Sequence, residues 1–166
     1  MKKIASIVLV VALGLFSCGS PTMDSALVKS MTIGHENGIV AGVNVGDSWD
    51  DVKKNVHEAW EIDESTHYLS KEWDSFNNVL LSIDLDEDNT AWAISYTING
   101  KKGNHLLMAE IQNALEKEFN AKYKVSESGG WDIVAPNGDQ CGLSMNLHKQ
   151  EDSGNNMLTV TVFNLS

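Results

Sequence analysis

Short segments in which apolar and polar residues alternate fill most of the chain after residue 60, and only a few residues separate each from the next. Alternation with a period of two is typical of β-strands that bury one face. The connections carry turn residues, as in 99–103 (NGKKG) and 136–139 (PNGD), and such short hairpins cannot make the crossover that parallel strands require. The sequence therefore predicts an antiparallel sheet, with strands at residues 66–73, 78–85, 90–98, 123–126, 131–135, 141–148 and 157–165.

Two segments have helical periodicity instead. Apolar residues recur at spacings of three and four in residues 49–60, behind Asp47 or Ser48 as the capping residue. The same spacing returns in residues 107–119, behind Asn104. The order helix, three strands, helix, three or four strands suggests a duplicated helix-plus-three-strand unit. We expect an α+β fold: a two-layer sandwich with two helices on one face of an antiparallel sheet.

The first eighteen residues have a different character. Lys2 and Lys3 precede residues 4–16, which contain no charged side chain. At ~1.5 Å rise per residue this run is too short to cross a ~30 Å hydrocarbon core, and small polar residues follow it at once. These features are typical of a secretory signal peptide.

The end of that run, residues 15–18 (Leu-Phe-Ser-Cys), resembles the lipobox of bacterial lipoproteins. The resemblance implies that the Cys18 thiol receives a diacylglycerol, that the chain is cut before Cys18, and that the new amine is acylated, for example by palmitate. Several acyl chains on one residue give a stable membrane anchor. The alternative is an ordinary signal peptide that happens to end near a cysteine.

The lipobox resemblance divides the chain into three parts and gives it a location. Residues 1–17 are the signal peptide, residues 18–31 are a lipidated N-terminus and flexible tether, and residues 32–166 form a single globular α+β domain. We expect a lipid-anchored protein of the cell envelope, facing the periplasm of a Gram-negative bacterium, with display on the cell surface left open.

A second resemblance involves residues 45–52 (VGDSWDDV) and the order of the elements. A glycine, a capped helix and a valine in this arrangement resemble small periplasmic domains of the beta-lactamase-inhibitor-like and outer-membrane-assembly lipoprotein kind. The resemblance implies a fold and carries over no functional residue, because fold alone does not fix function.

The charge of the chain restricts its partners. Its twelve basic residues are all lysines, its acidic residues number 23, and its formal net charge is −11, which becomes −13 when Lys2 and Lys3 leave with the signal peptide. An acidic chain without arginine repels phosphate backbones and lacks the side chain best suited to bind them. We therefore expect no nucleic-acid partner, and we expect a basic protein if the partner is charged.

The second cysteine is predicted to be structural. Once Cys18 is acylated, Cys141 is the only thiol left, so no internal disulfide can form. Cys141 shares strand periodicity with Leu143, Met145 and Leu147, which places it on the buried face, whereas His148 lies on the opposite face. The alternative is a reactive thiolate, for which the sequence gives no activating partner.

One acidic segment has part of the pattern of a calcium-binding loop. Asp84, Asp86 and Asp88 match the first three ligand positions of an EF-hand, but Asn89 stands where glycine is needed and Ser95 where glutamate is needed. A solvated hairpin tip fits better, and we predict no metal or other cofactor. The scattered histidines give no zinc spacing either.

The tryptophans are the remaining candidates for binding. Trp73 and Trp131 flank turns, where a ring facing solvent could stack on a sugar or anchor a protein partner. No catalytic motif is present, so we predict that the protein is not an enzyme. Our main hypothesis is a non-enzymatic protein-binding module such as an assembly factor, an inhibitor or an immunity-type protein. The alternatives are a carbohydrate or small-ligand accessory lipoprotein with exposed tryptophans, and an envelope enzyme.

The lipobox interpretation predicts the behaviour of a Cys18→Ala variant. Without the thiol no acyl chain can be attached, so we expect the variant to leave the membrane fraction and to lack the mass of the lipid. Cell fractionation and intact-mass spectrometry of both proteins test this. A Cys141→Ala variant is the control and should stay in the membrane fraction.

Overall fold

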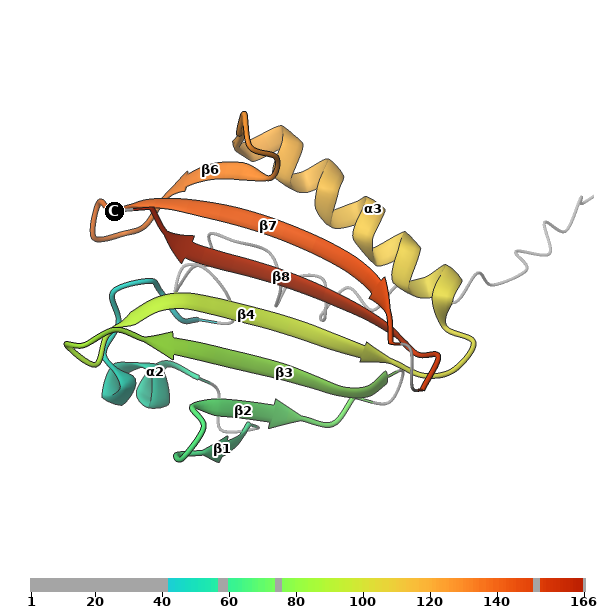
Figure 1. Cartoon of the computed structure of the whole chain (residues 1–166), viewed down its shortest axis with the longest axis horizontal. Coiled ribbons are helices and arrows are strands. Elements are labelled where there is room, and N and C mark those ends of the chain that lie inside the picture. Colours follow the sequence, from blue (N-terminus) through green and yellow to red (C-terminus); the bar gives the residue numbers. More distant parts are fainter. Residues whose placement is uncertain (1–41, 57–59, 74–75, 151–152, 166) are drawn as a thin grey trace, which may run out of the picture.

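The computed structural model describes residues 42–56, 60–73, 76–150 and 153–165, and in these residues it contains an eight-stranded antiparallel sheet and two helices (Figure 1). The helices are α2 (Trp49–Asn55) and α3 (His105–Lys122). The strands are β1 (Glu61–Asp63), β2 (Tyr68–Lys71), β3 (Phe76–Leu85), β4 (Ala91–Gly100), β5 (Lys124–Val125), β6 (Trp131–Val134), β7 (Gln140–Lys149) and β8 (Asn156–Asn164). The predicted α+β class with an antiparallel sheet is confirmed.

The strand order in the sheet is β1-β2-β3-β4-β8-β7-β6-β5. The last strand before α3, β4, therefore pairs with the last strand of the chain, β8. These strands pair from Ala93 opposite Phe163 to Asn99 opposite Met157. The number of strands before α3 differs from the prediction, because β1 adds a fourth. All three residues of β1 are exposed, so no alternation of buried and exposed residues marked it in the sequence.

The first helix is shorter than its apolar spacing predicted. It ends at Asn55, because Val56 has extended backbone angles, and residues 57–59 lie outside the described part. Of the two candidate caps, Ser48 is the one used: its hydroxyl accepts a hydrogen bond from the Asp51 backbone N–H at 3.2 Å. Serine at this position satisfies a donor that the helix itself leaves unpaired.

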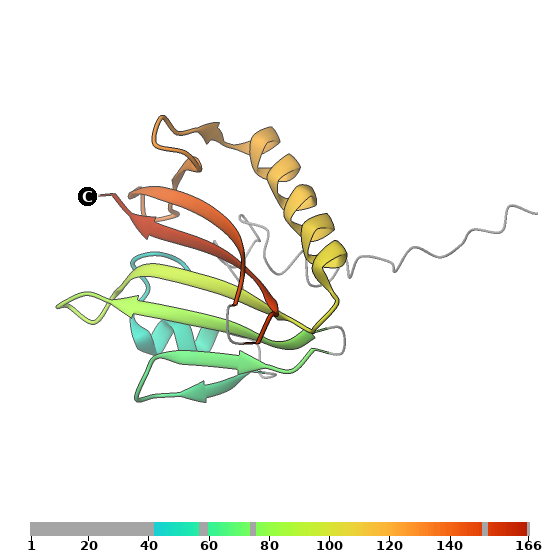
Figure 2. The same cartoon turned by 45° about the vertical axis from the view of Figure 1, so that its right-hand side comes forward.

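Both helices contribute to one hydrophobic core on a single side of the strands. In α3 the buried residues are Met108, Ile111, Leu115 and Phe119, spaced by three and four, and the helix packs across β7 and β8 (Figure 2). In α2 the buried residues are Trp49 and Val52.

The opposite side of the sheet is polar and partly exposed, and Figure 1 looks at a sheet with no described helix in front of it. We call the outward positions of its four central strands the outer face. Its residues are mainly serine, threonine and asparagine, with one carboxylate, Asp84, which pairs with Ala93. The outer face consists of Asn78, Leu80, Ser82, Asp84, Ala93, Ser95, Thr97, Asn99, Gly142, Ser144, Asn146, His148, Met157, Thr159, Thr161 and Phe163.

The turn between β5 and β6 allows a matched pair of substitutions. Gly129 and Gly130 both have positive φ, but only at Gly130 would a Cβ meet the Leu143 carbonyl oxygen, at 2.3 Å. We expect Gly129→Ala to cost about 1–2 kcal/mol of unfolding free energy from backbone strain alone. Gly130→Ala should cost more, because the backbone of β7 must also move. Urea denaturation of the two variants tests this, and equal losses would contradict it.

Candidate functional site

Three chain segments meet at one end of the sheet. The turn before α2 is hydrogen-bonded to the β3–β4 hairpin: the Gly46 N–H donates to the Ala91 carbonyl at 2.7 Å, and the Ala91 N–H donates to the Asp47 carbonyl at 2.8 Å. Ser48 and Thr90 form an isolated antiparallel bridge between the same segments. The start of α2 is thus held against the hairpin by backbone groups.

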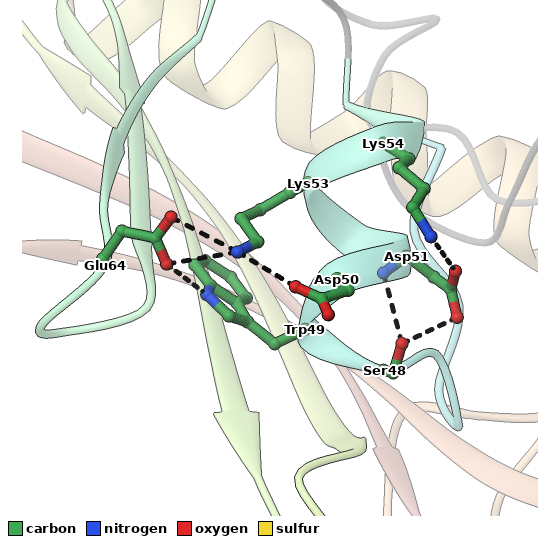
Figure 3. Close-up of polar contacts among 7 residues, drawn as sticks. All are labelled: Ser48, Trp49, Asp50, Asp51, Lys53, Lys54 and Glu64. Atoms are coloured by element: carbon green, nitrogen blue, oxygen red, sulfur yellow. Dashed lines mark hydrogen bonds and ion pairs between the residues drawn. The ribbon is translucent and has the colours of Figure 1, made fainter.

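A side-chain cluster joins the third segment, the β1–β2 turn, to α2 (Figure 3). The Trp49 indole N–H donates to Glu64 Oε2 at 2.8 Å. Lys53 Nζ lies 3.1 Å from Asp50 Oδ1 and 3.3 Å from Glu64 Oε1, and 5.7 Å from the centroid of the Trp49 ring. One lysine therefore bridges two carboxylates that belong to different elements.

These contacts gather carboxylates from all three segments, and we call the result the acidic end. Its only lysines are Lys53 and Lys54, and each forms an ion pair within it. Its acidic side chains are Asp47, Asp50, Asp51, Asp63, Glu64, Asp84, Asp86, Glu87 and Asp88. All of them are exposed except Asp47, which is half-buried.

Local hydrogen bonds keep several of these groups ionised. The Ser48 hydroxyl and then Lys54 lower the pKa of Asp51. The Trp49 indole, followed by Lys53, lowers the pKa of Glu64. The Thr90 hydroxyl and backbone N–H lower the pKa of Asp86. Because donors favour the charged form of a carboxyl group, these contacts hold Asp51, Glu64 and Asp86 in their ionised form at neutral pH.

Asp84, Asp86 and Asp88, which match the first ligand positions of a calcium loop, lie at this end, in and beside the β3–β4 hairpin. Asp86 folds the hairpin: its Oδ1 accepts from the backbone N–H groups of Asp88 and Thr90 at 3.0 and 2.9 Å, and its Oδ2 accepts from Thr90 Oγ1 at 2.7 Å. Asp84 and Asp88 are exposed. Within the described residues no three histidine, cysteine, aspartate or glutamate side chains are grouped as a metal site would need.

Neither tryptophan singled out in the sequence lies at the acidic end's surface. Trp131 has a core position, the alternative to a ring that faces solvent: it is 8% exposed, its indole donates to Asn120 Oδ1 at 2.8 Å, and its ring packs edge-on against Phe119. Trp73 is half-buried beside a shallow hollow of about 300 Å³, and Lys71 Nζ lies 5.1 Å from its ring centroid.

Trp92 is an exposed tryptophan that the sequence analysis did not single out. It shares the two-residue spacing of the buried residues Ile94, Tyr96 and Ile98, yet it is 45% exposed. The register explains the difference, because Asp84 pairs with Ala93 and Leu85 with Ala91, which leaves Trp92 as the extra residue of a β-bulge. Bulges re-aim side chains, and none of the residue types here signals one.

The prediction of an unreactive core cysteine agrees with the structure. Cys141 is fully buried on the inward face of β7, and burial, followed by the charge of Asp139, raises the pKa of its thiol. A thiol with a raised pKa is a poor nucleophile at neutral pH. His148, on the other face of the same strand, is exposed.

The remaining predictions concern residues outside the described part. Cys18, the signal peptide and the tether all precede residue 42. Among the helices of the described residues, none has the length and apolar character needed to cross a membrane.

Comparisons with family models, curated proteins and solved structures found no match.

The lowered carboxyl pKa values predict how stability depends on pH. A carboxylate whose folded pKa is depressed stabilises the protein above its ordinary pKa, and this contribution is lost as the pH falls through the folded pKa. For Glu64 the loss should begin near its ordinary pKa of 4.5 and extend below it. In urea denaturation between pH 7 and pH 2.5, the unfolding free energy of Glu64→Gln should decline less than that of the wild type. Glu61→Gln, an exposed carboxylate outside these contacts, should leave the decline unchanged.

Proposed function

We propose that the protein is a lipid-anchored component of the cell envelope that acts as a non-enzymatic protein-binding module and binds a basic partner with its acidic end. The observation that supports this most is the convergence of three chain segments, each contributing carboxylates, at one end of the sheet. An assembly factor, an inhibitor or an immunity-type protein would each use such a surface.

The arrangement of the acidic end suits recognition of a basic surface. Backbone hydrogen bonds fix its segments relative to one another, and Asp86 holds the hairpin that carries Asp84, Glu87 and Asp88. These three carboxylates are exposed, and the ion pairs of Lys53 and Lys54 are with other residues. A group of exposed like charges speeds association with a partner of opposite charge, and salt screens the effect.

The distribution of tryptophans favours this function over the carbohydrate alternative based on exposed rings. That alternative requires two or more exposed tryptophans along one groove. Of the five tryptophans, Trp92 alone belongs to the exposed class, whereas Trp49 and Trp131 are buried and Trp60 and Trp73 are half-buried.

We also propose that the domain is a two-layer sandwich built from a duplicated unit, with four strands per unit instead of three. The strand order supports this, because α2 precedes β1 to β4, α3 precedes β5 to β8, and the two series run outward from the β4–β8 pair. Both helices contribute to the same core. In such an arrangement the acidic end belongs to the first unit only.

The proposed binding site can be tested by neutralising charge in two places. The variant Asp84→Asn/Glu87→Gln/Asp88→Asn removes three charges from the acidic end, whereas Glu110→Gln/Glu116→Gln/Glu127→Gln removes three exposed charges from α3 and the β5–β6 turn. Each full-length protein is crosslinked in its native cells, and the captured proteins are quantified by mass spectrometry.

We expect a basic protein to be recovered with the wild type and the control, and its recovery to fall at least about tenfold with the acidic-end variant, because three charge contacts are lost. Washing at high salt should reduce recovery from the wild type. Equal loss with both variants would show that net charge, not this end of the molecule, determines capture. If the wild type were recovered with no crosslinked partner, the proposal would be contradicted.

A further inference from the structure

The turn between β6 and β7 has a chemically reactive sequence. Asn137 and Gly138 lie in this turn, and both are exposed. In an asparagine-glycine pair the backbone nitrogen of glycine can attack the asparagine side-chain amide, because glycine has no Cβ to hinder the approach. The sequence contains two other such pairs, at residues 99–100 and at residues 37–38, and the latter lie outside the described part.

Hydrogen bonds hold the Asn137 side chain in a position that favours this reaction. The Asp139 backbone N–H donates at 3.1 Å to Asn137 Oδ1, the oxygen that becomes negatively charged when the amide is attacked. A donor placed at a developing oxyanion stabilises the transition state. Asn137 Nδ2, the nitrogen that leaves, donates to Asp139 Oδ2 at 2.8 Å. One neighbouring residue therefore orients both the carbonyl oxygen and the leaving amine.

The attacking nitrogen is restrained by a hydrogen bond of the same turn. The Gly138 N–H donates to the Ala135 carbonyl at 2.9 Å, and Gly138 has a φ of 95°. A Cβ on Gly138 would meet no atom of the described residues within 4 Å, so this side of the turn is open to water and hydroxide. Opening of the turn frees the nitrogen, and an exposed turn opens at a lower free-energy cost than the interior of a sheet.

The pair at residues 99–100 has the same sequence in a different environment. Asn99 lies in β4, where it pairs with Asn78 on one side and Met157 on the other. Its side-chain amide donates to Asn78 Oδ1 at 2.5 Å, and Gly100 is buried. Attack on Asn99 requires that central strands separate, so the sheet protects this pair.

We propose that Asn137 is a site of spontaneous deamidation in the folded protein. The Gly138 nitrogen loses its proton to hydroxide and forms a bond to Asn137 Cγ. The bond between Cγ and Nδ2 then breaks, and the amine takes a proton from water and leaves as ammonia. Water opens the resulting cyclic imide to aspartate or isoaspartate, so the net change is hydrolysis of one amide to a carboxylate. This modification is independent of the proposed protein partner.

The product changes a contact beside the acidic end. Asn137 Nδ2 lies so close to Gly46 that a Cβ on this glycine would approach it to 2.5 Å, and Gly46 directly precedes Asp47 in the turn before α2. Deamidation replaces the donor that Asp139 accepts with a second carboxylate, and the two like charges repel each other. The modification therefore adds a negative charge next to the acidic end and weakens the β6–β7 turn that contacts it.

The test follows the full chain carrying Cys18→Ala during storage in mildly alkaline buffer, with a parallel sample unfolded in concentrated urea. Proteolysis and mass spectrometry measure the modified fraction of each asparagine, and protein isoaspartate methyltransferase detects isoaspartate. Asn99 is the internal control, because it is also followed by glycine and differs from Asn137 in its position in the fold.

We expect Asn137 in the folded protein to be modified at least about tenfold faster than Asn99, because a turn opens more readily than a sheet. In urea the two rates should be similar, since the protection of Asn99 is lost. Equal rates at the two sites in the folded protein would overturn the proposal. So would an Asn137 that is modified in urea and stays intact in the folded protein.

Two variants separate the charge of the product from the loss of the amide. Asn137→Asp introduces the carboxylate, whereas Asn137→Ser removes the amide and adds no charge. In urea denaturation at neutral pH, Asn137→Asp should unfold at a lower urea concentration than Asn137→Ser, and added salt should reduce the difference. Equal midpoints for the two variants would contradict the proposed effect of the modification.

Discussion

The pairing of β4 with β8 is the interaction on which the rest of the structure depends. These strands belong to opposite halves of the chain, yet seven consecutive residue pairs join them at the centre of the sheet. Each half alone would be a small meander with a helix and an incomplete core. The pair also aligns the inward residues Tyr96, Val160 and Ile98 in the core, because a strand's side chains alternate between faces and the register decides which side each one occupies.

Short-range patterns in the sequence were enough to predict the sheet and α3. The alternation in β8 and from Ile94 onward in β4 predicted which residues are buried, whereas in β7 Gly142 is buried and Met145 and Leu147 are only half-buried. The patterns failed where backbone geometry overrides side-chain periodicity. Val56 takes up an extended conformation and ends α2 early, and the bulge in β4 turns Trp92 outward against its spacing.

The candidate site was harder to predict than the fold because it is assembled from distant segments. The sequence revealed the acidic hairpin, but the hydrogen bond from Trp49 to Glu64 and the backbone contacts of Asp47 with Ala91 depend on tertiary structure. The acidic end is therefore a product of tertiary structure and not of any single segment.

The β-bulge in β4 makes Trp92 a fluorescent reporter on the surface of the protein. Trp92 is exposed directly beside Ala91, the residue that hydrogen-bonds the turn before α2, whereas the other indoles are buried or half-buried. A neutral collisional quencher such as acrylamide reaches an exposed indole far more readily than a buried one. The quenchable fraction of the intrinsic fluorescence therefore comes mainly from one residue at the base of the acidic hairpin, and its emission reports on the polarity of that place.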